Sequence, residues 1–129
     1  MSKENPFGEV ISQYTRKQAF LDGVLIDLSV WAEELGFKFP VACTAKVWHE
    51  WIVPPTELVW CQSERGRAHD VLWMLLMAIR VKKSNVSEIL YKVMFQQTDT
   101  KHETIQLKSV CGPGDDAEPI ITIMMPDED

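Results

Sequence analysis

An uninterrupted apolar run, residues 71–79, constrains the fold of this chain more than any other feature. The run is nine residues long, less than half of the ~20 residues that cross a bilayer, so a membrane span is not expected. It lies within residues 67–81, whose apolar side chains recur at helical spacing and occupy nearly the whole circumference. We therefore predict a helix over residues 67–81 that is buried at the centre of the fold.

The C-terminal third changes to a strand-like pattern. Residues 88–98, 103–110 and 119–126 have strand lengths and are rich in β-branched and aromatic residues. In the second segment, Ile105 and Leu107 alternate with polar residues, which is typical of an antiparallel sheet with one covered face. We predict an α+β fold in which helices of the N-terminal half pack on a C-terminal antiparallel sheet of three or more strands.

Capping and turn residues divide the N-terminal half into short elements. The predicted elements are a helix of about 16–22 that Thr15 begins and Gly23 ends, a strand over 24–29, a helix that Ser29 caps and Gly36 ends, an extended segment over 37–41, and a helix that Thr44 caps and Pro54-Pro55 ends. No linker interrupts the chain, so we expect a single domain over residues 1–129, with a short flexible tail at about 1–6.

The net charge of −6 is concentrated at the C-terminus, where two acidic clusters flank the last predicted strand. The clusters consist of Asp115, Asp116 and Glu118, and of Asp127, Glu128 and Asp129. An extended strand between them keeps them too far apart to share one cation. The first cluster alone is a weak metal candidate, and otherwise we expect solvated acids that discourage edge-to-edge aggregation. No other metal site and no cofactor are expected.

Two arginines and a histidine stand near the start of the central helix. Arg65, Arg67 and His69 could together bind an anion or a charged partner, because free amides and the helix dipole favour negative charge at this end. The alternative is structural: Arg67 pairs with Asp70 one turn later, and Arg65 is solvated.

The tryptophans are concentrated between residues 31 and 73. Trp48 and Trp51 share one face of a predicted helix. Tryptophan fills cores and is also enriched in binding hot spots, so these two residues predict either core packing or a surface for a protein partner or homodimer.

The remaining reactive and basic residues give weak signals. The three cysteines, Cys43, Cys61 and Cys111, form no CxxC pair and are expected to be buried free thiols. The three histidines are scattered, without an HExxH motif. A short basic patch, Arg80, Lys82 and Lys83, allows a weak DNA-binding regulator, but the net negative charge of the chain argues against nucleic acid as a partner.

Four segments together resemble a known family. They are YTRKQAFLDGVLIDLS (14–29), GFKFPVACTAKVW (36–48), GRAHDVLWMLLMAIR (66–80) and VCGPGDDAEPIITIMMPDED (110–129). The chain resembles, over about residues 6–129, a domain-of-unknown-function family of small bacterial proteins often carried on plasmids, prophages and other mobile elements. The resemblance assigns no catalytic or binding residues, so it implies a genomic setting and no chemistry.

These observations favour a non-enzymatic accessory protein of a mobile element that acts through protein contacts. The expected partner is a protein of unknown identity, with a second copy of the chain as one option. One alternative is a small-molecule-binding protein or enzyme with a pocket near Arg65, Arg67 and His69, and another is the weak DNA-binding regulator. Neither a signal-peptide core nor a membrane span is predicted, so we expect a soluble cytoplasmic protein without membrane contact.

Overall fold

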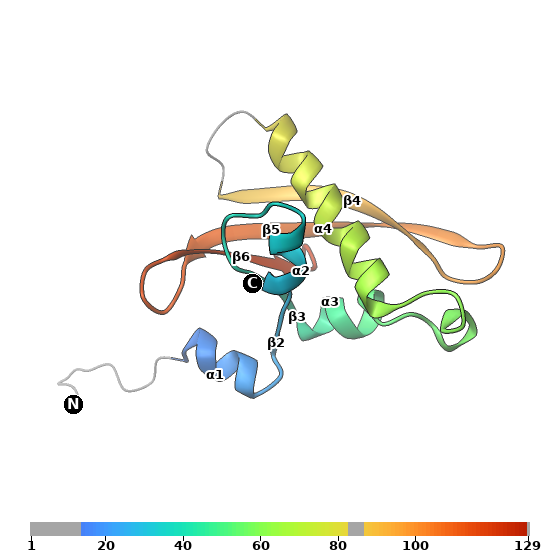
Figure 1. Cartoon of the computed structure of the whole chain (residues 1–129), viewed down its shortest axis with the longest axis horizontal. Helices are drawn as coiled ribbons and strands as arrows, with labels where there is room; N and C mark the ends of the chain where they lie inside the picture. Colours follow the sequence, from blue (N-terminus) through green and yellow to red (C-terminus); the bar gives the residue numbers. More distant parts are fainter. Residues whose placement is uncertain (1–13, 83–86, 129) are drawn as a thin grey trace.

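The computed structural model describes residues 14–82 and 87–128 (Figure 1). The elements are α1 (Arg16–Leu21), β2 (Leu25–Asp27), α2 (Ser29–Glu34), β3 (Val41–Thr44), α3 (Ala45–Val47), η1 (a π-helical turn, Trp48–Ile52), η2 (a 3-10 turn, Thr56–Leu58), α4 (Glu64–Val81), β4 (Glu88–Gln96), β5 (His102–Pro113) and β6 (Pro119–Met124). The flexible tail predicted at residues 1–6 lies outside the described residues.

One five-stranded sheet organises these elements, in the order β2-β3-β6-β5-β4. β4 and β5 are antiparallel, with Tyr91 opposite Leu107, and β5 and β6 are also antiparallel. β3 runs parallel to β6, with Ala42 beside Thr122. The α+β class is confirmed, but the prediction of a purely antiparallel C-terminal sheet is wrong, because the sheet is mixed and takes β2 and β3 from the N-terminal half.

The sequence does not predict β3, because residues 41–44 carry no alternation of apolar and polar side chains. Val41, Ala42 and Cys43 are all fully buried. A strand that is covered on both faces has apolar residues on both faces, so the period-2 signal of a half-exposed strand is lost. Its first residue therefore looked like the end of an extended connection.

The pattern predicted for the C-terminal hairpin is confirmed. Ile105, Leu107 and Ser109 of β5 are buried, and the polar residues between them are not. β4 has the same alternation, and its Tyr91 and Phe95 point into the same core. This inward face carries α4.

α4 begins three residues before its predicted start at residue 67. Ser63 is the reason, since its Oγ accepts a hydrogen bond from the backbone N–H of Gly66 at 3.0 Å and so caps the helix. On the sheet side, Ala68, Val71 and Leu75 are fully buried.

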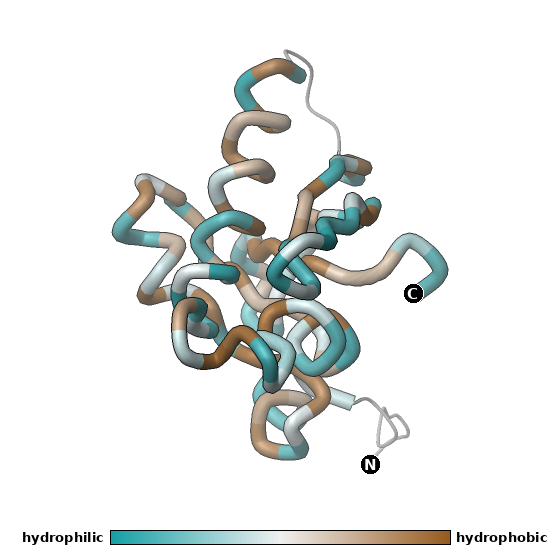
Figure 2. The backbone as a smooth tube through the Cα atoms, turned by 90° about the vertical axis from the view of Figure 1, so that its right-hand side faces the viewer, coloured by the Kyte–Doolittle hydropathy of each residue, from teal (hydrophilic) through white to brown (hydrophobic). Residues whose placement is uncertain are grey.

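The prediction that α4 is buried on all sides is wrong. Trp73 is 42% exposed and Val81 is 77% exposed. The helix lies across one face of the sheet with α2 at its flank (Figure 1), so only one side of it meets the core. Figure 2 shows hydrophobic colouring on most turns of its carboxyl-terminal half. An apolar helix thus has only part of its circumference covered by the described chain.

The caps of the short helices follow the sequence in two of three cases. Thr15 Oγ1 accepts from the N–H of Gln18 at 3.1 Å, and Thr44 Oγ1 accepts from that of Val47 at 3.3 Å, as predicted. Ser29 does not cap α2. It is the first helical residue, and its own N–H donates to Asp27 Oδ1 at 2.9 Å.

Candidate functional site

The guanidinium of Arg67 joins three segments of the fold. Its Nε donates to the carbonyl of Trp51 at 2.8 Å, and its Nη1 donates to Gln62 Oε1 at 2.7 Å and to the carbonyl of Gln96 at 2.9 Å. The group also lies over the ring of Phe95, 4.7 Å from its centroid. Arg67 is 3% exposed, and this burial lowers its pKa from the ordinary value, an effect that the charge of Asp70 opposes. Arg67 is therefore a structural cation.

The three residues predicted to form one anion site diverge. Arg65 is exposed and pairs with Glu34 of α2, Nη2 to Oε1, at 2.7 Å. The ring of His69 stacks on Trp73, with centroids 6.3 Å apart and planes 6° apart. The Arg67–Asp70 pair of the alternative prediction is wrong, because Arg67 bonds to Gln62 and two carbonyls instead, and the exposed Arg65 pairs with Glu34. A binding site for an anion or partner at Arg65, Arg67 and His69 stays a prediction.

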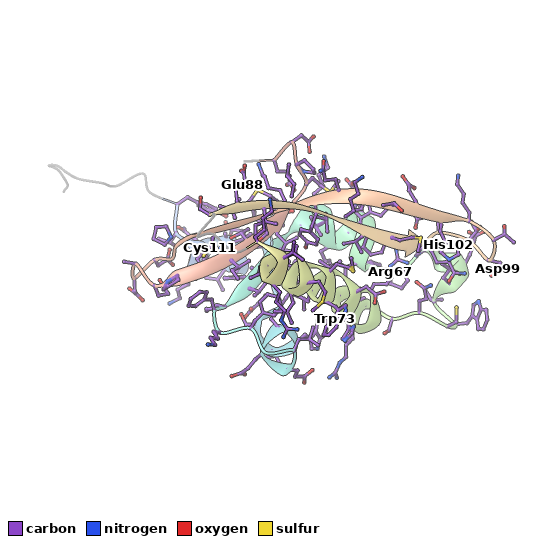
Figure 3. All side chains as sticks on the ribbon, turned by 90° about the horizontal axis from the view of Figure 1, so that it is seen from above. Arg67, Trp73, Glu88, Asp99, His102 and Cys111 are labelled. Carbon is purple, nitrogen blue, oxygen red and sulfur yellow. The ribbon has the colours of Figure 1, made fainter. Side chains whose placement is uncertain are left out.

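A hollow of about 380 Å³ opens beside Arg67 at the amino end of α4. Ser63, Gln96 and His102 are among its lining residues. Figure 3 shows Arg67 on the sheet side of α4, toward His102 at the end of the hairpin. One polar atom of this region, Arg67 Nη2, is buried without a hydrogen-bond partner.

Trp48 and Trp51 pack against the core. Trp48 stacks on Trp31, with ring centroids 6.4 Å apart, and Trp51 tilts against Phe95 at 5.5 Å. Both are half-buried. The core-packing alternative accounts for these contacts, and the predicted partner surface at these two residues gains no support from them.

A different tryptophan, Trp73, lies on an exposed surface that the sequence did not indicate. In Figure 3, Trp73 lies on the side of α4 that points away from the sheet. We define the outer face of α4 as the exposed Asp70, Trp73, Met74, Arg80 and Val81 with the half-buried Met77; Asp70 lies at its edge and also lines the hollow beside Arg67. The period of α4 could not separate this face from the buried one, because both are largely apolar.

One acid of the first cluster, Asp115, joins the loop before β6 to α1. Asp115 Oδ1 accepts from the backbone N–H of Arg16 at 2.8 Å, and its Oδ2 accepts from that of Lys17 at 3.0 Å. These amide donors lower the pKa of Asp115 from its usual value, because they stabilise the carboxylate. The side chain of Arg16 completes the contact by donating from Nη1 to Thr122 Oγ1 at 2.8 Å. The loop before β6 is thereby tied to α1.

The carboxylates of this cluster do not gather around a cation position. Asp115 faces α1, whereas Glu118 Oε1 accepts from the backbone N–H of Asp116 at 3.1 Å. Over residues 14–82 and 87–128, no group of three or more His, Cys, Asp or Glu side chains is placed to hold a metal ion. The described residues therefore give no support to a metal site at Asp115, Asp116 and Glu118.

Two acids of the second cluster are also engaged in the fold. Glu128 Oε1 accepts from Thr44 Oγ1 at 2.8 Å and from the backbone N–H of Met125 at 2.7 Å. Asp127 lies 3.8 Å from Lys46 Nζ. The prediction of merely solvated acids is wrong for Asp115 and Glu128. Both of these carboxylates line a broad hollow of about 800 Å³ next to α1, and both already accept hydrogen bonds from the same chain.

The cysteines and the basic patch offer no assembled site. Cys43 is buried, Cys61 is exposed and Cys111 is half-buried, so the prediction of buried thiols holds for Cys43 and is wrong for Cys61. In the basic patch, Arg80 and Lys82 are exposed, and Lys83 lies outside the described residues.

Two of the four segments that carry the sequence resemblance, 14–29 and 110–129, thus contact each other through Arg16 and Asp115. A family model covers residues 4–129, nearly the whole chain, including all four segments. The chain belongs to DUF6573, a family of unknown function. Comparisons of this DUF6573 chain with curated proteins and with solved structures give no match. Within its described residues, no helix combines the length and apolarity needed to cross a membrane.

Proposed function

We propose that this chain is a non-enzymatic accessory protein that acts by binding a protein surface through the outer face of α4. The observation that carries the proposal is the 42% exposure of Trp73 on this face. Leaving a large aromatic side chain in water forgoes the free energy of its burial. Tryptophan is also the residue type most enriched in binding hot spots.

The surroundings of Trp73 support the same function. Met74 is 41% exposed and Val81 is 77% exposed, so exposed apolar side chains continue from the indole toward the carboxyl end of the helix. The stacked ring of His69 limits the orientations of the indole. A contiguous apolar patch with a polar rim marks a protein contact more often than a chance feature of a monomer.

The polar groups best suited to chemistry are occupied elsewhere in the fold. Arg67, Asp115 and Glu128 bond to backbone or side-chain groups of the same chain. This engagement favours binding over catalysis. The sequence resemblance described above implies a setting on plasmids or prophages, so our proposal includes that the accessory role belongs to a mobile genetic element.

A photo-crosslinking experiment in the native host tests the proposal. A photoreactive amino acid replaces Met74 on the outer face of α4, and in a matched variant it replaces Met94, which is 62% exposed on β4. We expect one discrete crosslinked species from position 74 and none of comparable yield from position 94. Equal yields from both positions, or none from position 74, contradict the proposal.

A second candidate function is the binding of a small anionic molecule in the hollow beside Arg67. The observation that favours it is the buried Nη2 of Arg67, which has no partner. The hollow of about 380 Å³ falls within the ~300–1,000 Å³ range of ligand pockets. Thermal denaturation with inorganic phosphate, citrate and acetate tests it: a stabilisation that His102→Ala removes supports this function, and unchanged melting with all three anions excludes them as ligands.

A further inference from the structure

Four residues of the outer face of α4 follow the spacing of a coiled-coil seam. Asp70, Trp73, Met77 and Arg80 are separated by three, four and three positions, which is the alternation of the inward-facing positions in a heptad repeat. Met74 and Val81 flank this seam on one side. Between the seam positions lie Val71, Leu72 and Leu75, which α4 buries against the sheet. The helix therefore has one face for its own core and a second face shaped for another helix.

The order of charges along the seam selects the partner and its direction. Asp70 and Arg80 are each five positions from Leu75, and Trp73 and Met77 are each two positions from it. When two copies of α4 pack antiparallel with Leu75 at the centre, Asp70 of each copy lies opposite Arg80 of the other. The same register packs Trp73 against Met77. A parallel pair in register instead puts Asp70 against Asp70 and Arg80 against Arg80, which is repulsive.

We infer that the protein surface bound by α4 is a second copy of this chain, in an antiparallel helix pair with two-fold symmetry. The inference rests on the proposed function, since it names the occupant of the outer face. Such a pair is isologous, so each favourable contact occurs twice.

The flank of α4 adds to the charge complementarity. The Arg65–Glu34 pair at 2.7 Å shows that α2 lies beside the amino end of α4, and α2 also exposes Glu33 there. In the antiparallel arrangement, the carboxyl end of the second α4, with its exposed Arg80 and Lys82, approaches this acidic flank. An acidic neighbourhood at one end of the helix thus meets a basic one.

The size of the surface predicts a weak dimer. The 18 residues of α4 make a rod about 27 Å long and about 10 Å across. The area of one exposed side of such a rod is well below the ~800 Å² that each partner contributes to a standard stable interface. We therefore expect a concentration-dependent equilibrium with a dissociation constant on the order of 10 µM.

Charge reversal tests both the partner and the register. Sedimentation equilibrium on the full chain compares wild type with Asp70→Arg, Arg80→Glu and the double variant. The control is Lys92→Glu, at an exposed position of β4. Each single variant places like charges opposite each other twice per dimer and is expected to weaken association at least about tenfold. The double variant restores opposite charges and returns to near wild type, as does an equimolar mixture of the two single variants. All substituted side chains are exposed. Circular dichroism of each variant is the check that it folds.

Each outcome decides the inference. Association that is weakened by both single variants, restored in the double variant and unchanged in Lys92→Glu supports the antiparallel pair. A wild-type chain that stays monomeric up to about 500 µM overturns it, and so does association that ignores the charges of Asp70 and Arg80. If the chain is monomeric but position 74 still crosslinks a different protein, the inference fails while the proposed function stands. If position 74 gives no product and the chain is monomeric, both fail.

Discussion

The carboxylate of Asp115 accepts a 2.8 Å hydrogen bond from the backbone N–H of Arg16, although 99 positions separate the two residues in the chain. With its second oxygen on the N–H of Lys17, Asp115 binds two of the free amides that begin α1. The loop before β6 and the first helix of the described chain are thus joined by a charged cap from a distant segment. Asp115 therefore has a structural role in the fold that needs no external ligand.

Replacing Asp115 by Asn is expected to lower the melting temperature at pH 7 by a few degrees, because the amide lacks the negative charge and the second acceptor oxygen. Asp116→Asn is the matched control, since it removes the same charge from the adjacent position without touching α1. Differential scanning fluorimetry of both variants measures the difference. Equal melting of the two variants contradicts the cap.

The stabilisation by Asp115 also depends on pH in a definite direction. The amide donors lower its folded-state pKa below the ordinary aspartate value of about 3.9. The contribution is therefore fully present above that value and is lost as the pH falls through the lowered folded-state pKa. We expect the difference between wild type and Asp115→Asn to be the same at pH 7 and pH 5 and to shrink below pH ~4. A difference that grows on acidification is inconsistent with this cap.

Substitution of Arg67 should destabilise the fold much more than substitution of Arg65, although only one residue separates them. Arg67→Ala leaves the carbonyls of Trp51 and Gln96 without their donor and opens space against Phe95, so we expect a loss of about 3 kcal/mol in the free energy of unfolding. Arg65→Ala removes an exposed pair with Glu34 and should cost less than about 1 kcal/mol. Urea denaturation measures both. An Arg67→Ala loss as small as that of Arg65→Ala removes the structural role of the buried guanidinium.

The cysteines should differ in reactivity according to burial. Burial raises the pKa of Cys43 to about 12, so its thiol stays protonated at pH 8 and supplies almost no thiolate. Cys61 is exposed. Labelling with iodoacetamide, followed by peptide mass spectrometry, should modify Cys61 first and Cys43 only after denaturant is added. Comparable labelling rates in the native protein contradict the placement of β3.

Features that depend on local periodicity could be predicted from the sequence. The alternation around Ile105 and Leu107 reports a strand with one covered face, and the short-range caps at Thr15 and Thr44 need only three residues of context. The position of α4 followed from its apolar run to within three residues at its start. All of these are decided by neighbours in the chain.

The candidate sites could not be predicted, because they depend on contacts between distant segments. Nothing near Asp115 in the sequence indicates α1 as its partner, and nothing near Arg67 indicates the carbonyl of Gln96. The strand β3 lacks any period because it is covered on both sides. The outer face of α4 was hidden for the opposite reason: its apolar residues match those of the buried face, so the sequence predicted burial for Trp73 where the described chain leaves it exposed.

Whether a partner covers the outer face of α4 is tested most directly by comparing the oxidation of two methionines within one protein. Met74 lies on the outer face of α4 and Met94 on β4, and the two are 41% and 62% exposed. Hydrogen peroxide oxidation of the purified chain at about 1 µM and at about 500 µM, and in an extract of its native host, is followed at both residues by peptide mass spectrometry. We predict that Met74 oxidises readily in the dilute protein and becomes protected at high concentration or in the extract, while Met94 oxidises at the same rate throughout. Unchanged oxidation of Met74 in every condition would show that no partner covers the outer face of α4.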